Sequence, residues 1–122
     1  MAELSADDQD EAMRSVLRTL SASALATNLA RATTLADALD AAAAGSLRED
    51  GRAAAEHAAH QLMGSAGTFG SRYASQLAGG LERFFETALA SGHPAPADLA
   101  RAREQLELLQ AELGGEGHQD EG

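Results

Sequence analysis

Histidine is the residue type in this chain best suited to chemistry at neutral pH. Two of the four histidines, His57 and His60, lie three residues apart. A neutral imidazole nitrogen can act as a nucleophile or bind a metal ion, and residues three apart share one face of a helix. The spacing therefore leaves two kinds of site open, a metal-binding pair and an exposed nucleophile. Cysteine is absent, so a disulfide and a thiolate metal site are both excluded.

The residues around His60 indicate which way its side chain points. On a helix with about 100° per residue, apolar residues gather opposite His60, on the face that a helical protein buries. These are Ala55, Ala58, Leu62, Ala66 and Phe69. His60 is therefore predicted to face solvent, and His57 with it. Ligands of metal sites in helical bundles face the interior, so we expect no metal or other cofactor in this chain.

The face around His60 is unusual for a solvated helix surface. It consists of Glu56, His57, Met63, Gly64 and Gly67. A glycine inside a helix costs roughly 0.5 to 1 kcal/mol relative to alanine, so its presence one turn after His60 needs a reason. One interpretation is that the glycines lie in a frayed helix end. The other is that the missing side chains leave space for a second protein to cover the imidazole, while Met63 provides an adaptable apolar contact.

Residues 60–70, HQLMGSAGTFG, followed by Leu77 and the Leu81–Glu82 pair, resemble the motif of the histidine-containing phosphotransfer (HPt) domain family of two-component phosphorelays. The usual form of that motif is H-x-L-K-G-S-A-x-x-L/F-G with a later L-E or L-Q. The resemblance implies that His60 is a phosphoacceptor. It would take a phosphoryl group from the phospho-aspartate of a response-regulator receiver domain and pass it to another receiver. The protein would then be a carrier rather than an enzyme, with Mg²⁺ in the partner receiver and a hybrid histidine kinase as a further partner.

The resemblance also implies roles for other residues. Glu82 occupies the position whose side chain orients the imidazole, although without the motif it would be read as a solvated carboxylate. Gln61 is a candidate contact of the phosphoryl group. The expected partner-binding residues are Glu56, His57, Met63, Gly64 and Gly67. Packing roles fall to Ser65, Ala66 and Gly70.

Met63 departs from the family pattern, which usually has Lys there, so no cation from this position neutralises the phosphoryl group. A carboxylate such as Glu56 at about 4 Å would cost the phosphorylated form on the order of 1 kcal/mol in a water-like dielectric. We therefore expect a labile phospho-His60.

Helices must position these residues, because Ala and Leu dominate the 122-residue chain, aromatic residues make up 3% and there are two prolines. We expect one all-α domain over residues 1–115, an up-and-down antiparallel four-helix bundle with a short additional N-terminal helix, and an acidic disordered tail over 116–122. A bend over residues 19–23 would separate the short helix from a long one ending at Gly45. Later helices would run from residues 46–50 to about 66, from Ser71 to Gly92, and from about 97 to 113. Their predicted core positions are Leu25, Leu29, Ala32, Leu35, Leu39, Ala42, Ala74, Leu77, Leu81, Phe84, Ala88, Leu99, Ala102, Leu106, Leu109 and Leu113.

The formal net charge of -10 argues against nucleic acid as a partner. Charged residues interrupt the longest apolar stretch, residues 21–44, so no membrane segment is expected, and the acidic N-terminus lacks the pattern of a signal peptide. We expect a cytoplasmic monomer. His93 and His118 are expected to be surface residues without a role.

Two other functions stay open. A degenerate HPt-like adaptor or inhibitor would bind a receiver or a histidine kinase without carrying phosphate, and replacement of His60 would then leave binding and output unchanged. A self-associating bundle would instead use the surface around Met63, and the size of the free protein would reveal it.

Overall fold

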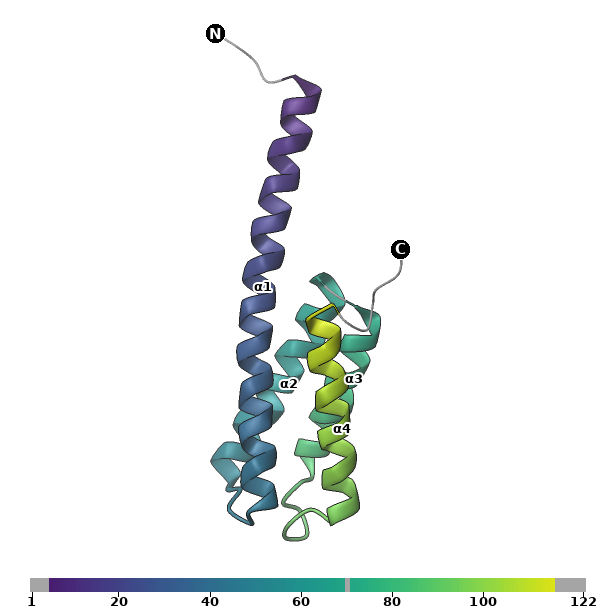
Figure 1. Cartoon of the computed structure of the whole chain (residues 1–122). Coiled ribbons are helices and arrows are strands. Elements are labelled where there is room, and N and C mark those ends of the chain that lie inside the picture. Colours follow the sequence, from purple (N-terminus) through teal and green to yellow (C-terminus); the bar gives the residue numbers. More distant parts are fainter. Residues whose placement is uncertain (1–4, 70, 116–122) are drawn as a thin grey trace.

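The computed structural model describes residues 5–69 and 71–115, and every regular element in that part of the chain is an α-helix. The helices are α1 (Ala6–Ala43), α2 (Glu49–Phe69), α3 (Arg72–Glu86) and α4 (Pro96–Leu113). They run alternately up and down, and each packs against two neighbours in the ring α1–α2–α3–α4 (Figure 1). The predicted four-helix bundle is confirmed. The predictions for Gly70, for the side chain of Phe69 and for the tail over 116–122 lie outside the described residues.

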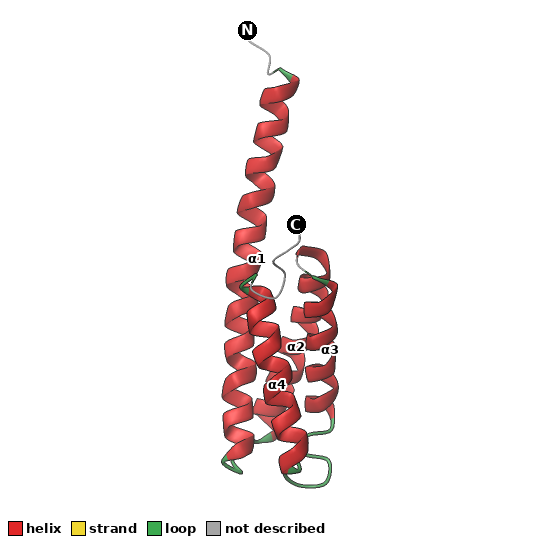
Figure 2. Ribbon diagram, turned by 45° about the vertical axis from the view of Figure 1, so that its right-hand side comes forward, coloured by secondary structure: helices red, strands yellow, loops and turns green. Residues whose placement is uncertain are grey.

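The N-terminal part of the chain differs from the prediction, because α1 is one continuous helix of 38 residues. The expected separate short helix, with its bend at residues 19–23, is wrong. The polar residues that suggested a bend are compatible with the helix, since the Thr19 hydroxyl donates to the carbonyl of Ser15. Ser5 caps the helix by accepting a hydrogen bond from the Asp8 backbone N–H at 3.1 Å. As a result, α1 projects well beyond the ends of the other three helices (Figure 2).

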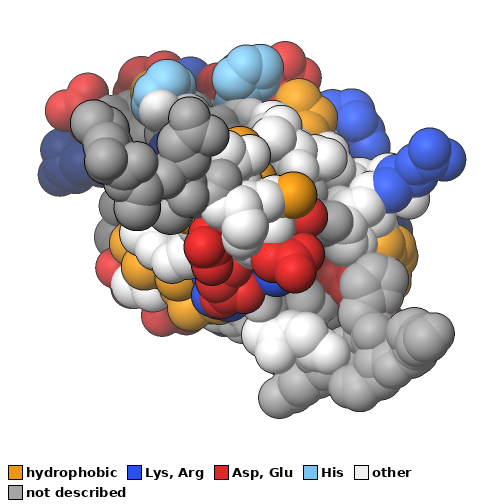
Figure 3. All heavy atoms as spheres, turned by 90° about the horizontal axis from the view of Figure 1, so that it is seen from above, with side chains coloured by type: hydrophobic (Ala, Val, Ile, Leu, Met, Phe, Trp, Pro, Cys, Tyr) orange, Lys and Arg blue, Asp and Glu red, His pale blue; other side chains and the backbone are white. Residues whose placement is uncertain are grey.

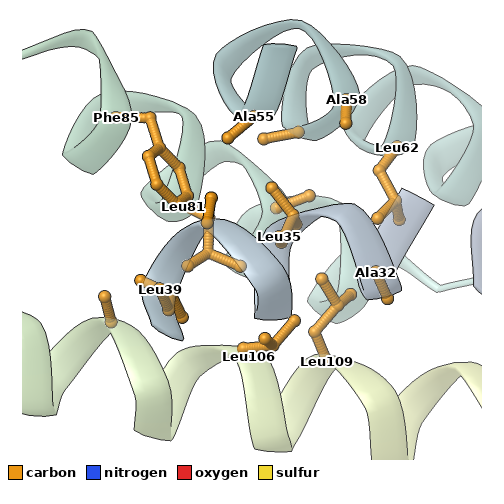
Figure 4. Close-up of a cluster of buried hydrophobic side chains, with 14 of the residues drawn as sticks. Ala32, Leu35, Leu39, Ala55, Ala58, Leu62, Leu81, Phe85, Leu106 and Leu109 are labelled. Atoms are coloured by element: carbon orange, nitrogen blue, oxygen red, sulfur yellow. The ribbon is translucent and has the colours of Figure 1, made fainter. Parts of the chain in front are cut away.

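The core lies where the apolar faces of the four helices meet, and Figure 4 shows it filled by small and branched side chains. Most of the predicted positions are buried. Those with at most 7% exposure are Ala32, Leu35, Leu39, Ala42, Ala55, Ala58, Leu62, Ala66, Ala74, Leu77, Leu81, Ala88, Ala102, Leu106 and Leu109. Leu99 and Leu113 are only partly buried. Leu25 and Leu29 were predicted to be buried but are 38% and 43% exposed, because the bundle ends near this level of α1.

Phe85, rather than the predicted Phe84, is the aromatic residue in the core, where it is fully buried. It follows Leu81 by four residues and Ala78 by seven, so it continues the buried face of α3. Phe84 is rotated away from that face and packs edge-on against Phe85, with ring centroids 5.0 Å apart.

The connections follow helix-ending chemistry. Gly45 ends α1 in the left-handed conformation with φ of 72°, as expected of a residue after a helix C-terminus. Ser71 caps α3 by accepting from the Ala74 N–H. In the connection between α1 and α2, the Ser46 hydroxyl donates back to the Ala41 carbonyl. Within the described residues, no helix has both the length and the apolar character needed to cross a membrane.

Phe85→Ala is expected to lower the free energy of unfolding by about 3–5 kcal/mol, because it empties a fully buried ring site. Phe84→Ala is the matched control and should cost clearly less. Urea titration followed by circular dichroism measures both. Equal losses would contradict this assignment of the core.

Candidate functional site

His60 lies on the outer face of α2, and its side chain is 62% exposed. Its orientation follows from the opposite face of the helix, where Ala55 and Leu62 are fully buried. Seen down the bundle, histidine side chains lie at the surface with acidic side chains close by (Figure 3). The imidazole is therefore presented to solvent at a place that the buried face of α2 determines.

Glu82, on α3, reaches the imidazole of His60. Its Oε2 lies 3.0 Å from Nδ1 of His60, and its side chain is only 20% exposed. A carboxylate can only accept, so this contact requires the proton to be on Nδ1. In the neutral form of the ring, the free lone pair is then on Nε2, on the other side of the ring.

Small residues let α2 and α3 approach closely enough for this contact. A Cβ on Gly79 of α3 would lie only 3.2 Å from the sulfur of Met63. One turn away, the Ser75 hydroxyl donates to the Met63 carbonyl at 2.8 Å. Met63 therefore leans onto α3 and is only partly exposed, although the sequence predicted it on the open rim.

The two glycines that follow His60 have different surroundings. Nothing lies within 4 Å of a Cβ built on Gly64, so the surface beside His60 is open there. A Cβ on Gly67 would meet the Ser75 side chain at 3.5 Å, which gives this glycine a packing role between α2 and α3. Gly64 has no such explanation within the described residues.

Carboxylates surround one side of the site. Carboxylate oxygens of Glu56, Glu82 and Glu86 lie within 4.8 Å of one another. Arg52 neutralises part of this charge by donating to Glu56 at 2.7 Å, and it also donates to the Phe85 carbonyl at the end of α3.

Arg52 is committed to these contacts rather than free to meet a phosphoryl group. Its hydrogen bonds to Glu49 and Glu56 hold the pKa of the guanidinium above its usual range. The hydrogen bond from Arg52 also lowers the pKa of the Glu49 carboxyl. In the acidic cluster of Glu56, Glu82 and Glu86, two of the three carboxylates already have cationic or hydrogen-bonding partners, Arg52 for Glu56 and His60 for Glu82.

Arg83 is a second cation near the site. Its Nη1 would lie 3.6 Å from a Cβ on Gly79, and the Met63 sulfur lies beside the same Cβ position. Met63 follows His60 on α2 by about one helical turn. The structure gives Arg83 no hydrogen bond or ion pair to any other described residue. A guanidinium from α3 therefore lies close to the place where the family motif has a lysine.

Residues 20–113 match the family model of the Hpt domain. This match spans well over half of the chain. The chain belongs to the Hpt domain family. Members of this family carry phosphoryl groups in two-component phosphorelays and interact with receiver domains. Searches of curated proteins and of solved structures found no match.

The rest of the Hpt motif connects the site to the bundle. Ser65 accepts a hydrogen bond from Nδ2 of the buried Asn28 at 3.0 Å, and Arg31 donates to Asn28 Oδ1. Ala66 is buried in the core. Sequence reasoning missed Asn28 and Arg31, although a polar residue inside an apolar stripe was a signal that could have found them.

The remaining predicted residues of the Hpt surface are exposed. Gln61 and His57 both face solvent on the His60 side of α2. His93 lies elsewhere, with its ring nitrogen 3.7 Å from a Cβ on Gly45. A surface cavity of about 590 Å³ lies between the end of α3 and the start of α4 and is not lined by His60 or Glu82. With 62% of its side chain exposed, His60 lies on an open surface.

Glu82→Ala is expected to slow phosphorylation of His60 roughly tenfold, because correct orientation of a reacting group contributes a factor of that order or larger to the rate. Glu82→Gln, which can still accept from Nδ1–H, should keep most of the rate, and Glu86→Gln serves as a control of equal charge change. Nitrogen NMR of the His60 ring should report a shift toward the other neutral tautomer in Glu82→Ala alone. An unchanged tautomer would contradict the orienting role.

Proposed function

We propose that this Hpt domain accepts a phosphoryl group on His60 from the phospho-aspartate of a receiver domain and relays it to another receiver. The observation that supports this best is an exposed imidazole whose Nδ1 is held by Glu82 at 3.0 Å while Nε2 stays free. The open space at Gly64 leaves room for a receiver to close over the ring.

In the forward step, the lone pair of Nε2 attacks phosphorus, the new N–P bond forms, and the P–O bond to the aspartyl group breaks. The electrons of that bond leave with the aspartate carboxylate. The ring becomes positively charged as Nε2 bonds to phosphorus, and Glu82 stabilises this charge through the Nδ1–H hydrogen bond. Delivery to a second receiver reverses these bond changes.

The receiver must supply most of the charge neutralisation, because phosphoryl transfer depends on positioning and on cations around the phosphoryl oxygens. We expect Mg²⁺ in the receiver to do this. On the Hpt side, Gln61 is the closest neutral donor in sequence, and the docking surface comprises Glu56, His57, Met63, Gly64 and Gly67. Of these, His57, Gly64 and Gly67 are exposed, whereas Glu56 and Met63 are partly buried.

Incubation with a phosphorylated receiver should transfer acid-labile phosphate to the wild-type chain and none to His60→Gln. His57→Gln is the matched control, because it removes an exposed imidazole from the same helix face three residues away. It should accept phosphate at close to the wild-type rate. Phosphorylation of His60→Gln, or its loss in His57→Gln, would refute the assignment.

The acidic cluster supports a second candidate, an adaptor that binds a receiver or histidine kinase without carrying phosphate. Three carboxylates near His60 disfavour a phosphoryl group there. This candidate predicts no phosphate on the wild-type chain, with His60→Ala binding its partner and giving the same output as before. A carrier would lose its output with the same substitution.

The lifetime of phospho-His60 should be set by the charges around it. Glu86→Gln is expected to lengthen it and Arg83→Gln to shorten it, each by a few-fold, because a unit charge at about 4 Å in water is worth about 1 kcal/mol. Arg101→Gln on α4, whose partner is Asp98, is the control and should change nothing. Decay of acid-labile phosphate in the isolated protein measures all three. A wild-type lifetime of many hours, unchanged in both variants, would contradict this account.

A further inference from the structure

The projecting part of α1 carries an apolar surface that the Hpt site does not explain. Met13, Val16, Leu17 and Leu20, here called the α1 stripe, are 59%, 53%, 52% and 49% exposed. Single exposed apolar residues are ordinary, but contiguous apolar patches on a protein surface mark interaction sites.

The α1 stripe lies beyond the end of the bundle. Ser21, Ala24 and Asn28 of α1 line one cavity together with Ala66 near the end of α2, Ser71 and Ala74 at the start of α3, and Leu113 at the end of α4. Residues before Ser21 therefore project past the other helices (Figures 1 and 2). The Hpt match begins at residue 20, so most of this stretch lies outside the part of the chain that matches the family model. A helix of this length standing alone is marginal in water.

The direction of the α1 stripe follows from helix geometry. Leu17 and Leu35 are separated by five turns of 3.6 residues, so they point the same way. Leu35 is fully buried against the other helices. The stripe therefore faces the side of α1 on which the bundle lies, into the space above its end.

We infer that this space is filled by the α1 stripe of a second copy of the chain, running antiparallel. A parallel pair is excluded. The bundle of each copy lies on the stripe side of its own α1, so in a parallel pair it would occupy the space needed by the C-terminal part of α1 of the other copy. In an antiparallel pair the bundles lie at opposite ends, and the contact is symmetric and closed at two copies.

The length of the stretch fits this pair. If Met13 of each copy lies opposite Leu17 of the other, Ala6 reaches the level of Ala24, where the partner's bundle begins.

The charge pattern also separates a second copy from other occupants. Acidic side chains occupy the first turns of α1, at Asp7, Asp8, Asp10 and Glu11, and an anionic membrane surface would repel them. Residues 116–122 contain no apolar side chain that could cover the α1 stripe. This inference replaces the expectation of a monomer.

Sedimentation analysis and light scattering of the full chain test the pair. The wild type should have twice the 12.5 kDa mass of one chain. Leu17→Glu/Leu20→Glu should be monomeric, whereas Ser15→Glu/Ala22→Glu, which adds the same charge on the opposite face of the same stretch, should stay dimeric. Both variants should keep the helical signal of the bundle, since all four positions are exposed. A monomeric wild type at about 100 µM, a higher assembly, or equal behaviour of the two variants would overturn the inference.

Cross-linking tests the orientation, because the chain has no cysteine of its own. A disulfide needs Cα atoms within about 7 Å. In the antiparallel register, Met13→Cys mixed with Leu17→Cys should form a disulfide between the two variants, and neither variant should cross-link efficiently to itself. Self-cross-linking of each variant without a mixed product would contradict the antiparallel arrangement. Neither experiment depends on phosphoryl transfer, so the inference and the proposed function can fail separately.

Discussion

The close approach of α2 and α3 is the contact on which the site depends. Gly79 leaves room for Met63 to lean across, and Ser75 ties the two helices together through the Met63 carbonyl. This spacing brings the Glu82 carboxylate to 3.0 Å from Nδ1 of His60. The imidazole thus gains an orienting partner from a neighbouring helix and still faces solvent. A larger residue at position 79 would displace Met63 and change the distance between the two groups that define the site.

In the proposed function, the surroundings of His60 divide the work between this chain and a receiver. The chain would provide an exposed nucleophile, a preferred tautomer and open space at Gly64. It has little positive charge there, since Glu56, Glu82 and Glu86 cluster nearby and Arg52 is bound to Glu49 and Glu56. Arg83 lies over Gly79 and is a candidate to compensate. A phosphoryl group on such a site would be favoured mainly while a receiver covers it, which would suit transfer better than storage.

The sequence predicted those features that follow from helical periodicity or from the family motif. The outward direction of His60 could be read from the apolar residues opposite it, and Glu82 from its place in the motif. Three features could not be predicted. The polar run over residues 19–23 suggested a bend, but α1 continues through it, with the Thr19 hydroxyl bonded back to the helix. Phe85 is buried instead of Phe84 because, at this turn, the buried face of α3 is rotated about the helix axis by one residue from the predicted face. The position of Arg83 depends on a side-chain direction that spacing does not determine.

The atom that carries phosphate is the most direct test of the account, because the Glu82 contact leaves only one ring nitrogen available. Correlation of ³¹P with ¹⁵N in the phosphorylated, nitrogen-labelled protein identifies that atom. The account predicts a single phosphohistidine, at His60, with phosphorus bonded to Nε2 and a proton retained on Nδ1. Phosphorus on Nδ1 of His60, or on any other histidine, would contradict it.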